Sequence, residues 1–529
     1  MSNKTEIKSI VEKNEHLREY LFTRGFIFTN NQSINANEYP FYGNWKSFTF
    51  GSYILLVDEK INVFYKKNNE KNNEKIYILI GHAYNPFDGV YDEDELIENL
   101  FQNVFFDYFN QWTGVFTLIC IYDNKLEVFG DCAGMQANYY GIVNDNIYIS
   151  SHAQLIGDIC NLTKTKYVES MMKYKFWQMY GLFLPGDISQ FSSIYRLVPN
   201  TYLSINCDLK ECKITRFYPQ KMIKCVSSEE EYYEIISQIG NILHENMNLI
   251  SKKWKKPAIS MTGGMDSKAT LASANGLYDR FKYYSYDSMS GDKPDAKAAA
   301  IIAKAIGVDH KIYSISENDN DFENIYEITK IMEHNLGDIG KVNANDVRKR
   351  IYFMNTDKFD VEVKSWVSEI GRANYYKKFG KNKMPERLTP RQMTTMYKFF
   401  SYNRILAIET DKIFKKYIER VKFDDIFNYD SSDMYLWEFR YGSWGGLVIT
   451  SEHRVSYDIT IPYNNRLLME LFLKLPLEKR IKDTPHYDLI KKLNPLIDET
   501  GITVTNYNET KKRMYMEKVY YIVNNALPF

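Results

Sequence analysis

Apolar and polar positions follow two different periods along the first half of this chain. Residues 5–21 carry apolar side chains at helical spacing. From residue 25 onward, short β-rich runs are separated by polar turns, and a helical pattern over residues 94–109 interrupts them. Many strands with few helices predict an α+β sandwich for this part of the chain. The β-rich runs cover residues 25–28, 47–57, 61–65, 75–83, 113–122, 125–129 and 146–151.

The pattern changes after residues 217–228, where proline and lysine residues break the β-rich period. A helical period over residues 229–249 follows, and then β-like and helical stretches alternate, which is typical of a doubly wound α/β sheet. A chain of 529 residues is too long for one core. We therefore predict two domains, residues 1–222 and 223–529. The alternating stretches are β-like at residues 258–261, 281–286, 311–316 and 361–367, and helical at residues 295–306.

Residues 262–267 (TGGMDS) are the most informative segment, because they join a predicted strand to a predicted helix. Two glycines let the backbone approach a polyphosphate, and the N–H groups of the first helical turn attract an anion. No Gly-Lys-Ser/Thr closes the loop as in the Walker pattern, and the third glycine of a dinucleotide fingerprint is missing. The segment therefore suits a pyrophosphate group, with an ordinary Gly-Gly turn as the alternative.

Four segments carry a resemblance to known families. Residues 262–267 resemble the SGGxDS signature of the PP-loop ATP pyrophosphatases, with Thr262 in place of the leading serine. Residues 109–118 look like the LNGxFAF strand of the glutaminase-type domain in the asparagine synthetase family, and residues 128–140 look like its RDxxGxxPLYY hairpin. Residues 195–203 resemble the LxPG segment that closes this domain.

The order of these segments resembles the asparagine synthetase family, which implies its fold and cofactors. The expected fold is an N-terminal Ntn-type αββα sandwich, followed by a HUP-type doubly wound α/β synthetase domain with a helical C-terminal part. The expected cofactors are ATP and Mg²⁺. Asp266 is the expected metal ligand, because a hard carboxylate suits a hard cation. The residues that would hold the nucleotide phosphates are Thr262, Gly263, Gly264, Asp266, Ser267 and Lys268.

A second constellation, residues 366–372 (WVSEIGR), resembles the SGEGADE segment of the same family. Glu369 matches its first glutamate and would deprotonate the incoming amine; a surface glutamate at a strand end is the alternative. Arg372 falls where the family has a metal-binding aspartate. Either the metal uses Asp266 with phosphate oxygens and water, or Arg372 itself contacts phosphate.

Two further sites are expected from the resemblance. Tyr286 and Asp287 follow a predicted strand where family members recognise adenine and ribose, although a plain turn would also explain them. Relatives that close rings, such as β-lactam synthetase and the lasso peptide cyclases, place a lysine near the C-terminus to stabilise the transition state. Lys482 is our candidate, with Lys479 as the other choice, and solvated charges beside a Leu-Pro turn are the alternative.

The N-terminal domain lacks the nucleophile of a glutaminase. Enzymes of this family use an N-terminal cysteine, but residue 2 is Ser2 and no cysteine precedes Cys120. A helical segment also separates the start of the chain from the first predicted strand. We therefore expect a domain that does not hydrolyse glutamine.

Composition limits the partners. Lys+Arg and Asp+Glu both number 67, so the net charge of +0 gives no field to hold nucleic acid. No signal peptide and no long apolar stretch is found in the sequence, so we expect a cytoplasmic protein without membrane contact. The six cysteines lack CxxC spacing, which argues against zinc and disulfides, and all precede Thr262, which disfavours a tRNA-thiolating PP-loop enzyme.

The expected activity is that of an AMP-forming carbon–nitrogen ligase. It would adenylate a small-molecule or peptide carboxylate and capture it with an amine acceptor, without glutamine hydrolysis. The amine could be ammonia, a second substrate or an internal group. The alternative is a non-catalytic binding or scaffolding protein. A homo-oligomer and a biosynthetic partner protein both stay open.

Overall fold

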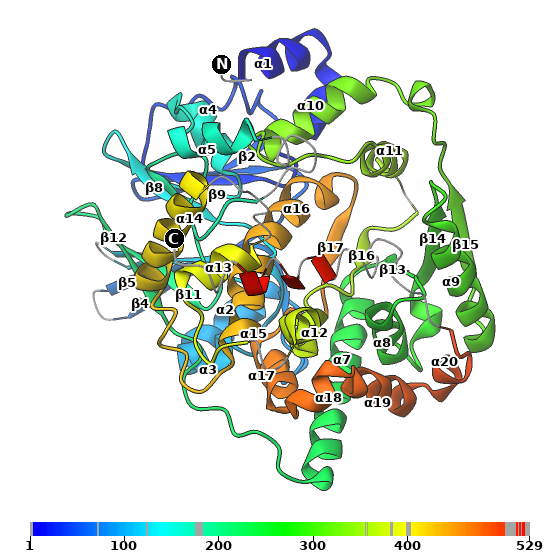
Figure 1. Cartoon of the computed structure of the whole chain (residues 1–529). Helices are drawn as coiled ribbons and strands as arrows, with labels where there is room; N and C mark the ends of the chain where they lie inside the picture. Colours follow the sequence, from blue (N-terminus) through cyan, green and yellow to red (C-terminus); the bar gives the residue numbers. More distant parts are fainter. Residues whose placement is uncertain are drawn as a thin grey trace.

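The computed structural model describes residues 4–70, 73–122, 125–174, 183–354, 356, 358–380, 384–397, 404–502, 515–516, 518–519 and 521–523. It contains two antiparallel sheets, one parallel sheet and many helices, so the expected mixture of α+β and α/β structure is confirmed. In Figure 1 the antiparallel sheets lie on the left and the parallel sheet lies on the right. No helix within the described ranges is both long enough and apolar enough to cross a membrane.

The first antiparallel sheet has the strand order β10-β8-β9-β1-β3-β2. The run over residues 47–57, predicted as one strand, is instead the hairpin β2-β3, because Gly51 turns the chain with φ +60°. As the apolar spacing predicts, a helical segment precedes the first strand: α1 (Lys4–Lys13) and the 3₁₀ helix η1 (Glu15–Tyr20). The strands are β1 (Phe26–Thr29), β2 (Trp45–Phe50), β3 (Tyr53–Asp58), β8 (Tyr139–Val143), β9 (Asn146–Ser150) and β10 (Ile194–Arg196).

The second antiparallel sheet has the strand order β12-β11-β7-β6-β5-β4. The predicted helical pattern over residues 94–109 forms two helices, α2 (Glu93–Gln102) and α3 (Phe105–Phe109). The strands are β4 (Val63–Glu70), β5 (Asn73–Tyr84), β6 (Thr113–Tyr122), β7 (Lys125–Gly130), β11 (Thr201–Asn206) and β12 (Glu211–Arg216).

The two antiparallel sheets pack face to face between helices. Alternate residues of β5 point to opposite faces: Ile76, Ile78 and Ile80 join the cluster between the sheets, whereas Tyr77 points outward and stacks on Phe101 of α2 at 4.2 Å between ring centroids. On the outer face of the first sheet, a second cluster packs α1, α4 (Ala153–Cys160) and α10 (Ile325–Asn335) against the strands. The order of layers is therefore helix, sheet, sheet, helix.

The parallel sheet has the order β15-β14-β13-β16-β17. Since the order reverses between β13 and β16, the connections leaving these two strands diverge, and this is the position where ligands bind in open α/β sheets. The strands are β13 (Pro257–Ser260), β14 (Lys282–Asp287), β15 (His310–Ser314), β16 (Val361–Val363) and β17 (Asp458–Thr460). The helices nearest this sheet include α7 (Glu229–Lys253), α8 (Met265–Ser273), α9 (Lys293–Ile306) and α19 (Thr484–Leu493).

The strand predicted over residues 361–367 is shorter than expected. It ends at Val363, and Val367 adopts φ +76°, a conformation that a β-branched residue reaches only under strain. The 3₁₀ helix η4 (Ser368–Arg372) follows directly. The β-branched composition favoured a strand, but the chain turns out of the sheet at its carboxyl edge.

The C-terminal part is mostly helical, as expected. It contains an unusual π-helix, η6 (Tyr435–Gly445), a geometry that is often found at functional sites. Its other described helices are α11 (Ala344–Phe353), α12 (Asn374–Phe379), α13 (Pro390–Met396), α14 (Arg404–Val421), α15 (Ser431–Met434), α16 (Gly446–Ser451), α17 (Arg466–Lys474), α18 (Leu477–Ile481), α20 (Pro495–Glu499) and η7 (His453–Val455). Earlier in the chain lie α5 (Lys166–Met172), η2 (Tyr278–Arg280) and η3 (Asp319–Asp321).

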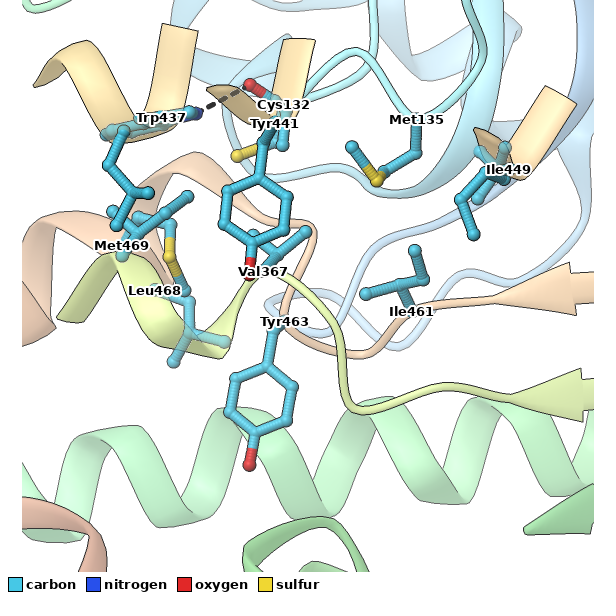
Figure 2. Packing of buried hydrophobic residues seen from close by; sticks show 14 of the residues in the cluster. Cys132, Met135, Val367, Trp437, Tyr441, Ile449, Ile461, Tyr463, Leu468 and Met469 are labelled. Atoms are coloured by element: carbon cyan, nitrogen blue, oxygen red, sulfur yellow. Dashed lines mark hydrogen bonds between the residues drawn. The ribbon is translucent and has the colours of Figure 1, made fainter. Parts of the chain in front are cut away.

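The sandwich and the parallel-sheet part share a continuous hydrophobic cluster. Figure 2 shows one contact between them, where the indole N–H of Trp437 in η6 donates to the carbonyl oxygen of Cys132 at 2.8 Å. Residues 217–228 connect β12 to α7 without helix or strand. The division into residues 1–222 and 223–529 stays a prediction.

Candidate functional site

The loop between β13 and α8 lies at the carboxyl edge of the parallel sheet, and its own side chains hold it in place. The N–H of Thr262 donates to the hydroxyl of Ser267 at 3.1 Å, and the N–H of Gly264 donates to the hydroxyl of Thr262 at 3.2 Å. The N–H of Gly263 donates to Asp295 Oδ1 of α9, also at 3.1 Å. These three N–H groups would have to exchange partners in order to bind phosphate.

The helix that follows the loop offers an anion-attracting end. Gly264 is the N-cap of α8, and the N–H groups of the first helical turn have no partner within the helix. Lys268 lies one turn further on, but its ammonium group donates to the carbonyl oxygen of Ile502 at 2.8 Å. Burial lowers the pKa of Lys268. Lys268 therefore binds the chain itself in this structure.

Asp266 is joined to the turn after β16. Ser368 donates its hydroxyl hydrogen to Asp266 Oδ1 at 2.6 Å, and Arg372 Nη1 donates to Asp266 Oδ2 at 2.6 Å. Both side chains come from η4, which follows β16. Since β16 is the direct neighbour of β13 in the sheet, η4 lies beside the loop that follows β13. The two motifs found in the sequence thus meet at the point where the strand order reverses.

Arg372 also binds a second carboxylate, which the sequence did not single out. Its Nε donates to Asp483 Oδ1 at 2.7 Å and its Nη2 donates to Asp483 Oδ2 at 3.1 Å, a two-pronged contact. Asp483 is the N-cap of α19 and also accepts from Lys377 of α12. Burial opposes the charge on Arg372, but hydrogen bonding to Asp483 and the negative charge of Asp266 outweigh it and raise the pKa of Arg372.

Glu369 lies beside this network and remains exposed to solvent. The hydroxyl of Tyr441 in η6 donates to Glu369 Oε2 at 3.2 Å. Partial exclusion of water and the nearby charge of Asp266 raise the pKa of Glu369, whereas Arg372 and Arg440 lower it. Because the carboxylate can still contact water, the first of these effects is weaker than it would be for an enclosed group.

The turn that carries these side chains is tightly packed. A Cβ added to Gly371 would lie 2.8 Å from Cβ and Cγ of Phe472, so only glycine fits there. Val367, strained at φ +76°, begins the turn, and it belongs to the same buried hydrophobic cluster as Tyr441, part of which Figure 2 shows. A strained residue held by dense packing is typical of functional sites.

His486 of α19 is a further neighbour that no motif in the sequence marks. It is fully buried, and its Nε2 lies 3.8 Å from Asp266 Oδ1. Burial lowers the pKa of His486 to about 4, with Arg372 and Lys377 adding to the effect and Asp266 opposing it. The imidazole is therefore neutral near pH 7.

Three expected site residues lie apart from this network. Tyr286 and Asp287 end β14 at the same edge of the sheet, and the ammonium group of Lys349 lies 4.0 Å from the Tyr286 ring centroid. Lys482 is exposed at the end of α18, where no hydrogen bond or ion pair of its ammonium group is found within the described ranges. Lys479, the other lysine considered, pairs with Glu229 at 2.7 Å.

The donor set does not suit a protein-held divalent cation. Both oxygens of Asp266 and both oxygens of Asp483 accept hydrogen bonds from other side chains. Within the part of the chain that is described, no three His, Cys, Asp or Glu residues cluster as metal ligands. The expectation that Asp266 binds Mg²⁺ stays a prediction.

Comparison with known proteins yields little for this sequence. It matches no protein-family model and no curated protein. Two similar solved structures are described as the allosteric regulatory enzyme of purine biosynthesis (TM-score 0.24) and the glutamine phosphoribosylpyrophosphate amidotransferase from B. subtilis complexed with ADP and GMP (TM-score 0.20). Each match has 9% sequence identity and covers 58% of this chain. The matches span 62% of the length of the first structure and 63% of the length of the second. Similarity this low carries no conclusion about function.

Proposed function

We propose that the chain is an ATP-dependent, AMP-forming amide ligase that works without glutamine hydrolysis. The observation that carries the proposal is the meeting of Asp266, Ser368 and Arg372 where the sheet order reverses between β13 and β16. This position combines a glycine-rich loop, a helix N-terminus and charged side chains, which together suit a nucleotide polyphosphate.

The reaction would have two steps. A carboxylate oxygen of the substrate attacks the α-phosphorus of ATP, the bond to the bridging oxygen breaks, and pyrophosphate leaves. The amine then attacks the acyl carbon, AMP leaves, and the nitrogen loses a proton. The first turn of α8 and the guanidinium of Arg372 would offset the charge on the leaving pyrophosphate.

Glu369 is the proposed acceptor of the amine proton. It is accessible to solvent, and its pKa is raised above the usual value of a carboxyl group, which makes it a stronger proton acceptor. The hydrogen bond from Tyr441 fixes one of its oxygens. Tyr441 is thus a positioning residue, because it acts through Glu369.

The test uses hydroxylamine as a general amine acceptor. The protein is incubated with ATP and a panel of amino acids and short peptides, and both pyrophosphate and hydroxamate are measured. The proposal expects equal amounts of pyrophosphate, AMP and hydroxamate. With ammonia or an amino acid in place of hydroxylamine, it expects a loss of roughly 100-fold or more in amide formation for Glu369→Gln. Glu317→Gln, at an exposed glutamate outside the site, is the matched control and should be unchanged. Release of ADP, or amide formation unaffected by Glu369→Gln, would contradict the proposal.

A non-catalytic binding protein is the second candidate. It is favoured by one observation: Asp266 and the loop N–H groups already have partners within the chain. This candidate predicts that ATP binds but yields no pyrophosphate with any carboxylate. Calorimetric binding of ATP alongside the pyrophosphate measurement separates the two functions.

A further inference from the structure

We propose that the guanidinium group of Arg372 replaces a divalent cation in this site, so that the chain binds ATP without Mg²⁺. The inference rests on the proposed function and deepens it. It names the residue that contacts the phosphates, and it specifies the free nucleotide as the ligand in place of the Mg²⁺ complex.

The carboxylates nearest the loop are already occupied. Asp266 accepts from Ser368 on one oxygen and from Arg372 on the other, at 2.6 Å each. Asp483 accepts from Arg372 on both oxygens. Mg²⁺ needs direct contact with carboxylate or phosphate oxygens in near-octahedral geometry. To bind Asp266, the ion would have to displace a guanidinium that two carboxylates hold in place.

Arg372 is built to present a fixed positive charge. The two-pronged contact with Asp483 fixes the plane of its guanidinium group, and the contact with Asp266 places that plane beside the start of α8. A guanidinium has five N–H donors, and the described contacts use three of them. One hydrogen on each terminal nitrogen has no acceptor within the described ranges. The side chain keeps 19% of its surface exposed, so a phosphate can reach it.

The charges of the site support the same conclusion. Without a cation, Asp266 and Asp483 would repel a polyphosphate placed against the loop. Arg372 binds both carboxylates, and Lys377 adds a second positive charge at Asp483. The pairs Arg372–Asp266 and Lys377–Asp483 are then neutral, and the N-terminus of α8 supplies the attraction. This compensation is what a divalent ion supplies between two carboxylates.

The test is the affinity for ATP with and without metal. Calorimetry measures the Kd of ATP for the full chain in EDTA and in excess MgCl₂. The inference expects the two values to agree within about threefold, a small change on the scale of a lost charged contact. Arg372→Gln should weaken binding in EDTA by about tenfold or more, as expected for loss of a charge-assisted hydrogen bond.

Arg372→Asp gives a second, opposite expectation. It removes the cation and adds a carboxylate, so binding in EDTA should be lost and MgCl₂ should restore it in part. The matched control is Arg280→Asp, the same substitution at an exposed arginine of η2 just before the amino end of β14, away from the loop. It should leave both Kd values unchanged.

The outcomes separate the inference from the proposed function. Binding of ATP only in MgCl₂ would overturn the role of Arg372 and leave the ligase proposal standing. Metal-independent binding that Arg372→Gln does not weaken would also overturn it. No binding of ATP in either buffer would overturn both. Because the first comparison uses the unaltered chain, a variant that fails to fold does not affect it.

Discussion

Asn464 and Asp131 form a buried hydrogen bond between the two parts of the chain, with Asn464 Nδ2 donating to Asp131 Oδ1 at 2.9 Å. The same amide donates to the carbonyl oxygen of Gly114 at 2.6 Å, and its Oδ1 accepts from the N–H of Ala133 at 2.8 Å. Asn464 follows β17 of the parallel sheet, whereas its partners belong to the sandwich. This side chain is therefore one of several that hold the carboxyl edge of the parallel sheet against the sandwich.

Replacement of Asn464 by alanine should lower the free energy of unfolding by about 2–4 kcal/mol, because buried polar groups lose their partners. Chemical denaturation followed by tryptophan fluorescence measures the change. Asn103→Ala, at an exposed asparagine after α2, is the control and should cost little. Equal stability of the two variants would contradict the structural role of Asn464.

Lowering the pH should destabilise the protein through His152. Burial, together with the charges of Arg454 and His334, lowers the pKa of His152 to about 3. The unfolded chain therefore binds a proton below about pH 6.5 that the folded chain does not bind until about pH 3. Stability is complete above pH 6.5 and falls as the pH decreases.

The contribution of this histidine between pH 7 and pH 5 is about 2 kcal/mol. Thermal unfolding at the two pH values measures the loss, and in His152→Gln the loss should be smaller by that amount. The comparison uses the pH dependence of stability and not stability itself, so a uniform cost of the substitution does not affect it. An unchanged pH dependence in the variant would show that His152 binds a proton as readily in the folded chain as in the unfolded chain.

Gly371→Ala should disturb the candidate site from a position that bears no functional group. The added Cβ meets Phe472 at 2.8 Å, so η4 must shift or Phe472 must move, at a cost of about 1–3 kcal/mol. Since Arg372 is the next residue, ATP binding should weaken together with stability. Gly291→Ala, where the added Cβ has an ordinary contact of 3.4 Å with Met289, is the control. Native-like ATP affinity in Gly371→Ala would show that the turn tolerates displacement.

Local patterns in the sequence predicted much of the fold. The β-like run before Gly263, the two glycines and the helix-forming stretch after them are neighbours in the chain, and they form β13, the loop and α8 as expected. The β-rich runs likewise predicted β1 to β7 and β9 of the sandwich, but none was predicted over β8, β10, β11 or β12. The runs also failed where a turn was decided by one residue, at Gly51, and where a β-rich run ended early, at Val363.

The partners of the candidate site could not be predicted in the same way. Asp483 and Tyr441 lie 111 and 72 residues from the site residues that they contact, Arg372 and Glu369. Neither belongs to a motif, and no periodicity marks a π-helix or an N-cap carboxylate as part of a distant site. Lys482 stays a prediction, whereas its neighbour Asp483, which the sequence did not single out, contacts Arg372.

The sequence by itself determined the strand-loop-helix unit at Gly263 and the arginine at position 372. These features are set by residue identity and by the conformations that neighbouring residues allow. Only the tertiary structure decided that Arg372 binds Asp266, since that contact spans 106 residues and exists because β16 pairs with β13. Backbone preferences act over a few residues, whereas charge pairing depends on which strands become neighbours.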